Sequence, residues 1–198
     1  MAEEVSDNEL MVRIVARDEE AFRRLVERHQ DRVYGTVARM MGKPCPEAEE
    51  AAQDIFLRVW RSAGTYRAEG QFTTWLMTVV RNQLFTRLEQ KGRREEIDRE
   101  DRVDPETGES LMESQPEAVG RGPAQRLAYN ELEMEVARAC AQLPKNQRLV
   151  IHLRQYEGMD LQEIGKVTGM SLTAVKAAMF RARESLKKKL SGYLTASK

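Results

Sequence analysis

The strongest constraint on the fold lies at residues 160–190, where a short amphipathic segment, a glycine and a longer basic segment follow one another. Asp160 and Glu163 have the spacing of a capping box, in which two side chains satisfy unpaired backbone amides at the start of a helix. Gly169 suits the positive φ that ends a helix, and Ser171 can cap the next one. The segment therefore predicts two helices joined by a tight turn, a helix-turn-helix.

The second of these helices has one apolar side and one basic side. At about 100° per residue, its apolar residues form a stripe that we expect to be buried: Leu172, Val175, Met179, Ala182, Leu186 and Leu190. From Ser171 to Leu190 there are six basic residues and one acidic residue, a local charge of +5. A basic helix that follows such a turn indicates DNA binding more strongly than an ordinary solvated face.

Phe180 is the unusual residue on the side opposite the apolar stripe, because it is a large aromatic flanked by Lys176 and Arg181. In a DNA complex its ring can touch a thymine methyl group while the cations contact phosphates or guanine edges. The alternative is that a neighbouring helix covers Phe180.

Helical spacing also dominates the rest of the chain. Period-two alternation never persists where apolar residues cluster, so we predict an all-α fold. The 198 residues suffice for one large or two small domains. Because 32 basic and 32 acidic residues give a net charge of zero, any affinity for DNA must come from local patches.

Residues suited to catalysis or metal binding are few and scattered. Cys45, Cys140, His29 and His152 lack ligand-like spacing, so we expect no metal, no cofactor, no disulfide framework and no enzymatic activity. The acidic N-terminus and the lack of about 18 consecutive apolar residues predict a soluble, cytoplasmic protein without membrane insertion.

Four helices are expected in the N-terminal half, and they can form one compact bundle. A short helix follows Asp7, and a longer one begins after Asp18 and ends at Gly42. The third runs from Pro46 to about residue 63, and the fourth from near Phe72 toward residue 90.

An acidic stretch separates the two halves. Residues 95–117 contain ten acidic residues against Arg99 and Arg102, a charge of −8, and prolines and glycines lie in and just beyond it. Such a composition lacks the apolar content to fold alone. We therefore predict a flexible acidic linker at 93–123, between domains at 1–92 and 124–198.

Motifs in both halves resemble one family. The helix EAEEAAQDIFLRVWR (47–61) and the segment YRAEGQFTTWLMTVVRNQL (66–84) resemble region 2 of the extracytoplasmic-function (ECF) sigma factors, small bacterial relatives of sigma-70. Residues 143–148 and 171–190 resemble region 4 of the same family. The resemblance covers roughly 8–92 and 124–192 and implies a factor that binds core RNA polymerase, directs it to promoter DNA and helps to melt the promoter.

The resemblance also implies which residues meet polymerase. The third helix would contact the clamp helices of the largest catalytic subunit, through exposed polar residues: Gln53, Asp54, Arg58 and Arg61. An amphipathic helix with Trp60 anchored beneath a mixed-charge face suits a pair of partner helices. The alternative for each charge is an ordinary solvated face.

By the same resemblance, the loop at 66–73 and the helix that follows would meet the unpaired strand of the downstream promoter element. The implied contacts are Tyr66, Arg67, Thr73, Arg81, Asn82 and Arg87. The Asn82 amide could read a base edge while Arg81 and Arg87 hold phosphates. Phe72 and Trp75 could stack on bases, but their helical spacing favours the core.

The upstream element would lie against the basic helix, with the implied contacts Ser171, Thr173, Lys176, Ala177, Phe180, Arg181 and Arg183. Ala177 and Ala178 stand where relatives often carry Ser and Arg, so the preferred upstream sequence stays open. The angular position of Arg183, near the apolar stripe, suggests either a phosphate contact or an internal ion pair.

Three further points stay open at the level of sequence. The acidic linker would run through the polymerase's template and RNA-exit path as in relatives, or it is a spacer. An anti-sigma factor that masks both DNA-binding faces is a possible partner. The second half alone also fits a dimeric helix-turn-helix regulator that binds a palindromic site without polymerase.

Overall fold

The computed structural model describes residues 5–42, 45–68, 70–100, 132 and 134–196. Its elements are α1 (Asp7–Val15), α2 (Glu19–Met41), α3 (Pro46–Ser62), the 3-10 helix η1 (Ala63–Thr65), α4 (Phe72–Glu100), α6 (Lys145–Gln155), α7 (Leu161–Thr168) and α8 (Leu172–Ala196). Residues 134–141 are helical as well. Within these ranges there is no strand, which confirms the predicted all-α fold.

The N-terminal helices begin and end at the predicted residues. The Asp18 side chain accepts a hydrogen bond from the Ala21 amide at 3.0 Å and so caps α2. Gly42 ends the same helix with a φ of 87°, in the left-handed region that suits glycine. Pro46 occupies the first position of α3, where its missing N–H costs no hydrogen bond.

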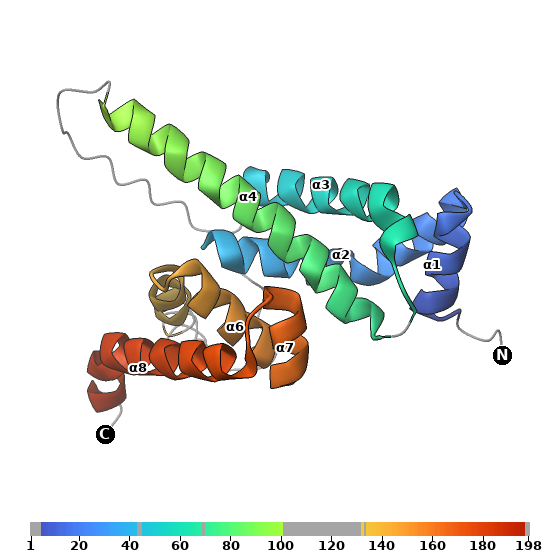
Figure 1. The fold of residues 1–198 in the computed structure, drawn as a ribbon. Coiled ribbons are helices and arrows are strands. Elements are labelled where there is room, and N and C mark those ends of the chain that lie inside the picture. The colour runs from blue at the N-terminus through green and yellow to red at the C-terminus, as the bar shows by residue number, and fades with distance from the viewer. Residues whose placement is uncertain (1–4, 43–44, 69, 101–131, 133, 197–198) are drawn as a thin grey trace, which may run out of the picture.

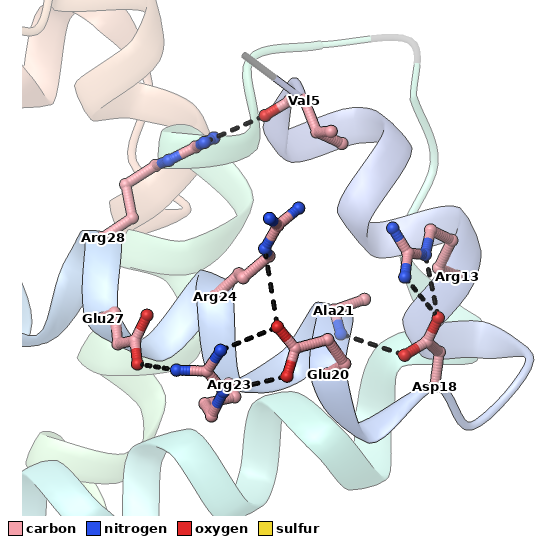
Figure 2. A network of polar contacts seen from close by, with 9 residues as sticks. All are labelled: Val5, Arg13, Asp18, Glu20, Ala21, Arg23, Arg24, Glu27 and Arg28. Carbon is pink, nitrogen blue, oxygen red and sulfur yellow. Dashed lines mark hydrogen bonds and ion pairs between the residues drawn. The ribbon is translucent and has the colours of Figure 1, made fainter. Parts of the chain in front are cut away.

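Polar contacts fasten α1 to α2. Arg28 donates to the carbonyl of Val5 at 2.9 Å, as Figure 2 shows, and to Asp7 at 2.7 Å. The buried ring of His29 lies 2.9 Å from the other oxygen of Asp7. Burial raises the pKa of the Asp7 carboxyl, but hydrogen bonds from His29 and Arg28 outweigh burial and hold the pKa below its usual range. Asp7 is therefore ionised at neutral pH and joins the two helices.

The outer face of α2 carries a second set of charges, which pair within the helix (Figure 2). Arg23 pairs with Glu20 and Glu27, and Arg24 lies 3.6 Å from Glu20. All four side chains are exposed. Exposed pairs of this kind contribute at most about 1 kcal/mol each, so they matter less for the fold than the Asp7 contacts.

The expected four-helix bundle is present in the N-terminal half. The α2 helix packs against α1, α3 and α4, and α3 also packs against α4. Its core includes the fully buried residues Leu10, Met11, Ile14, Leu25, Ile55 and Leu76. Burying each such side chain contributes about 1.5–3 kcal/mol.

The α4 helix is longer than predicted. We expected it to end near residue 90 and the linker to begin at 93, but the helix continues to Glu100 (Figure 1). The charged residues at 91–100 are mostly Lys, Arg and Glu, which are good helix formers. Their propensity maintains the helix where the acidic composition predicted a linker. The rest of the predicted linker, from 101 on, lies outside the described residues.

The C-terminal helices pack on one another and on the bundle. The α8 helix packs against α6 and α7, while α7 also contacts α4 and α6 contacts α2 (Figure 1). The buried apolar residues of both halves belong to one continuous cluster. The predicted helix-turn-helix therefore lies against the helix that carries the predicted downstream contacts.

Candidate nucleic-acid and polymerase interfaces

The predicted helix-turn-helix is present with its predicted caps. The Asp160 side chain accepts a hydrogen bond from the Glu163 amide at 2.8 Å, and Glu163 accepts one from the Asp160 amide at 2.8 Å. Gly169 ends α7 with a φ of 69°. The Ser171 hydroxyl accepts a hydrogen bond from the Ala174 amide at 3.2 Å at the start of α8. Local capping thus defines both ends of the turn.

The inner face of α8 follows a helical stripe, with one departure from the prediction. Its buried residues are Val175, Ala178, Met179 and Ala182. Leu172 was predicted to be buried but is 43% exposed, because it is the first residue of α8 and lies at the end of the stripe. Leu186 and Leu190 are half-buried.

Most predicted upstream contacts lie on the outer face of α8. The exposed members are Ser171, Thr173, Lys176, Phe180, Arg181 and Arg183, while Ala177 is half-buried. Ala178 is buried, so only the first of the two alanines lies toward this face. Arg183 forms no ion pair with any described residue, so the internal ion pair, one of the two alternatives, is not found in this part of the chain.

Phe180 is 67% exposed, so no described helix covers it as the alternative would require. An aromatic ring left in water loses the stabilisation that burial would provide. Its neighbours Lys176 and Arg181 are exposed cations. The outer face of α8 therefore combines positive charge with one apolar ring, as a major-groove reading helix does.

Among the predicted downstream contacts, Tyr66 is buried rather than presented to solvent. Its hydroxyl donates a hydrogen bond to Asn8, and its ring packs edge-on against Phe72 at 5.9 Å and Trp75 at 5.4 Å. Burial and the nearby Asp7 carboxylate raise the pKa of Tyr66, so the hydroxyl stays protonated. In this arrangement Tyr66 holds the loop in place.

Arg67 and Thr73 lie at the two ends of the loop that follows this buried tyrosine. Arg67 is exposed and donates to the carbonyls of Gly64 at 3.3 Å and Tyr66 at 3.2 Å. Thr73 is half-buried near the start of α4. Phe72 is buried, as its helical spacing predicted.

Asn82 and Arg81 lie together on α4 but differ in exposure. Asn82 is exposed, and its carbonyl oxygen accepts a hydrogen bond from Arg81 at 2.9 Å. Arg81 is half-buried, with its guanidinium 5.0 Å from the centre of the Phe85 ring. Lys145, from α6, lies 5.0 Å from the same ring. The C-terminal half thus reaches the region of Arg81.

Arg87 is joined to α3 instead of standing free. It pairs with Glu50 at 2.5 Å and with Asp54 at 3.2 Å. Asp54 belongs to the predicted polymerase contacts, so the structure brings Arg87 to that set and away from Asn82.

The predicted polymerase face of α3 is open to solvent. Gln53, Asp54, Arg58 and Arg61 are all exposed. Beneath them, Trp60 packs against Phe22, with ring centres 5.0 Å apart.

Leu57 is a member of this face that sequence reasoning missed. It is 49% exposed and lies one turn from Gln53 and Arg61. The signal was available, because Leu57 falls outside the apolar stripe formed by Ile55, Phe56 and Val59. An exposed apolar side chain surrounded by polar ones has the composition of a protein–protein interface, with an apolar centre and a polar rim.

Comparison with known proteins identifies the family. Sigma-70 region 2 matches residues 25–94, and Sigma-70, region 4, matches residues 133–186. The ECF RNA polymerase sigma-E factor of Haemophilus influenzae is 30% identical, over 96% of this chain and 98% of its own length. The RNA polymerase sigma-H factor of Pseudomonas aeruginosa is 28% identical over 96% of each chain.

A solved structure shares the fold. The sigma factor RpoE from Bartonella quintana, crystallised with the anti-sigma factor NepR, has a TM-score of 0.65 and 20% identity. The match covers 86% of this chain and 96% of that one.

These matches show that the chain belongs to the ECF group of sigma-70 family RNA polymerase sigma factors. It is a transcription initiation factor that acts with RNA polymerase. The predicted resemblance is confirmed for both regions and their order. No helix in the described ranges is both long enough and apolar enough to cross a membrane.

The orientation of α8 can be tested with two adjacent residues. Met179→Ala should lower the free energy of unfolding by about 2–5 kcal/mol, because it leaves a cavity in the core. Phe180→Ala should change that free energy by no more than about 0.5 kcal/mol, because the ring is exposed. Urea unfolding followed by circular dichroism measures both, and equal losses would contradict the assigned orientation.

Proposed function

We propose that this sigma factor recognises a promoter at two elements. The helix α8 reads the upstream element in the major groove, and the loop at 66–73 with α4 binds the unpaired downstream element. The observation that carries the proposal is Phe180, exposed between Lys176 and Arg181 on the outer face of a helix-turn-helix. The domains are assigned to 1–92 and 124–198, with the connection at 93–123 beginning as an extension of α4.

At the upstream element, Arg181 and Lys176 supply contacts to guanine edges or phosphates, and Phe180 meets a thymine methyl group. Ser171, Thr173 and Arg183 contact the phosphate backbone of the DNA at the edges of the groove. Ala177 brings no donor to the groove, so specificity there comes from fewer polar contacts than in relatives with Ser at this place.

Arg181→Ala should reduce promoter-directed transcription about tenfold or more, since a bidentate contact to guanine contributes about 1–3 kcal/mol. Affinity for core polymerase should not change. The measurements are run-off transcription from a pool of promoter fragments and titration of labelled core. Lys188→Ala, which removes another cation of α8, is the matched control. Equal loss of transcription and core binding would refute the assignment.

At the downstream element, Asn82 is the base-reading residue, because its amide is exposed and already polarised by Arg81. Arg81 and Arg67 hold phosphates beside it. Tyr66 and Thr73 support the loop and α4, and Arg87 bridges to the polymerase face through Asp54. The single strand then lies along the first half of α4.

Asn82→Ala should leave holoenzyme assembly intact but slow promoter opening about tenfold, because a base edge loses its partner. Permanganate reactivity of unpaired thymines follows opening, and gel mobility follows assembly. Gln90→Ala, an exposed amide two turns further along α4, should behave as the unchanged chain does. Normal opening in Asn82→Ala would remove this residue from the site.

The polymerase contact is assigned to the outer face of α3. Leu57 is the apolar centre, and the surrounding Gln53, Asp54, Arg58 and Arg61 form a polar rim. Interfaces between helices commonly combine a buried apolar centre with charges that set orientation. Core polymerase is the partner of this face.

Leu57→Ala should weaken binding to isolated core polymerase about tenfold, because an anchor residue typically contributes 1 kcal/mol or more. The fold should be unaffected, since the side chain is half exposed. Val12→Ala removes an exposed apolar side chain from α1 and serves as the control. A fluorescence binding curve with labelled core decides the matter, and equal affinities of the two variants would contradict the proposal.

An anti-sigma factor is a candidate regulator, because RpoE from Bartonella quintana was crystallised with one. The site of action is the cytoplasm, where RNA polymerase transcribes. Mixing the purified chain with bacterial core polymerase tests the whole proposal first. Binding to promoter DNA as a homodimer without polymerase would contradict the proposed recognition of two elements by the polymerase-bound factor.

A further inference from the structure

The two halves of the chain meet at a polar junction between α2 and α6. On α2, Arg32, Thr36 and Arg39 are four and three residues apart, so they lie on one face of the helix. Opposite them are His152 of α6 and Glu157, which follows α6. Arg23 and Arg24 lie two turns or more before Arg32 on α2, outside this junction.

At the centre of this junction, the buried side chains of Thr36 and His152 are hydrogen-bonded. The Thr36 hydroxyl donates to the carbonyl of Arg32 at 2.8 Å, and His152 Nε2 lies 3.0 Å from the same hydroxyl. Because the hydroxyl hydrogen is used by the carbonyl, Nε2 is the donor to Thr36. The two residues are 116 positions apart, so this bond exists only while the halves are together.

Glu157 carries a charge that is buried in the junction. Its side chain is 6% exposed and lies 3.0 Å from Nε of Arg32. A buried carboxylate needs a positive partner, and here that partner comes from the other half of the chain. Removing Arg32 would leave the buried carboxylate of Glu157 without its arginine and with His152, 3.7 Å away, as its nearest basic group while the halves stay together.

Further contacts extend the junction along α2. Arg148 donates to the carbonyl of Met40 at 2.7 Å, and the guanidinium of Arg39 lies 4.2 Å from the centre of the Tyr156 ring. Just beyond the end of α2, Gly42 lies close to Ala141 of the C-terminal half. A Cβ added to Gly42 would come 3.2 Å from the Cβ of Ala141.

A second part of the contact involves the predicted DNA-binding elements. The α7 helix, first helix of the helix-turn-helix, packs against α4. Next to it, Lys145 pairs with Glu89 of α4, and this hydrogen bond holds the pKa of Glu89 below its usual range. Lys145 also shares the Phe85 ring with Arg81, whose Nε is buried without a partner among the described residues.

We propose that the free sigma factor closes on itself, with the ion pair between Arg32 and Glu157 as the latch, and that closure withholds Arg81 from promoter DNA. This inference rests on the proposed function of α4 and gives its regulation. The C-terminal half then competes with the unpaired DNA strand for the Arg81 region. Core polymerase binds the open state more tightly than the closed state and so shifts the balance toward opening, which exposes Arg81.

The junction has the character of a reversible contact. Nδ1 of His152 and Nε of Arg148, like Nε of Arg81, are buried without a hydrogen-bond partner among the described residues. Each would gain water when the halves separate, so each favours the open state. Apolar burial and the latch favour the closed state. Because the two sets of terms oppose each other, one ligand or one substitution can shift the balance.

Zero-length cross-linking of the full chain tests closure directly. A water-soluble carbodiimide joins a carboxylate to an amine only when the two are in contact, and Glu89 and Lys145 meet that condition across the junction. We expect the Glu89–Lys145 linked peptide in the free chain by mass spectrometry. Its yield should fall at least fivefold in Arg32→Ala and on addition of core polymerase. Mixed isotope-labelled chains distinguish links within one chain from links between chains.

Matched variants make the result specific. Arg24→Ala removes an arginine about two turns before Arg32 on α2, outside the junction, and should keep the full yield. Arg32→Lys retains the charge and should recover most of it. Circular dichroism verifies that Arg32→Ala is folded. X-ray scattering should show a larger radius of gyration for Arg32→Ala than for Arg24→Ala.

The outcomes separate closure from the proposed function. A free chain that binds core polymerase but yields no Glu89–Lys145 link, or the same yield in Arg32→Ala, overturns the latch while the sigma factor assignment stands. A chain that gives the link but never binds core overturns the proposed function and the regulatory role with it. Link formation in the free chain that core polymerase and Arg32→Ala both abolish supports the proposal.

Discussion

Burial on two sides of α4 is the constraint on which both halves of the chain depend. Its buried apolar residues are Phe72, Leu76, Met77, Val80, Leu84 and Phe85. At 100° per residue they cover more than half of the helix circumference, because α2 and α3 pack on one side and α7 on another. An arc of about 140° is left to solvent. Asn82 falls in that arc, whereas Arg81 falls beside Phe85 and Arg87 beside Val80. This placement explains why Asn82 is exposed while the two arginines contact other side chains.

Local features of the fold were predictable because their causes lie within a few residues. Capping by Asp18 and Asp160 and the left-handed glycines Gly42 and Gly169 depend on neighbours in sequence, and the structure has all four as expected. The same holds for the buried stripe of α8, apart from Leu172 at its end. The extension of α4 was missed because the acidic charge of residues 95–100 was given more weight than their helix propensity.

The partners of individual side chains were harder to predict, because they come from distant parts of the chain. Tyr66 looked like a loop residue that could meet DNA, but Asn8 and Trp75 enclose it. Arg87 looked like a phosphate contact, but Glu50 and Asp54 hold it against α3. Glu157 and Thr36 gave no signal at all. Their importance arises only from a junction between residues more than a hundred positions apart.

The extension of α4 also changes where the chain leaves the N-terminal bundle. The ten residues from 91 to 100 add about 15 Å at 1.5 Å per residue, and in Figure 1 this end of α4 projects past the other helices. The helical extension therefore sets the point at which the connection to the C-terminal half begins. Removing one turn of it would move that point by about 5 Å along the helix axis and leave its direction around the axis nearly unchanged, whereas removing two residues would turn it by about 160°.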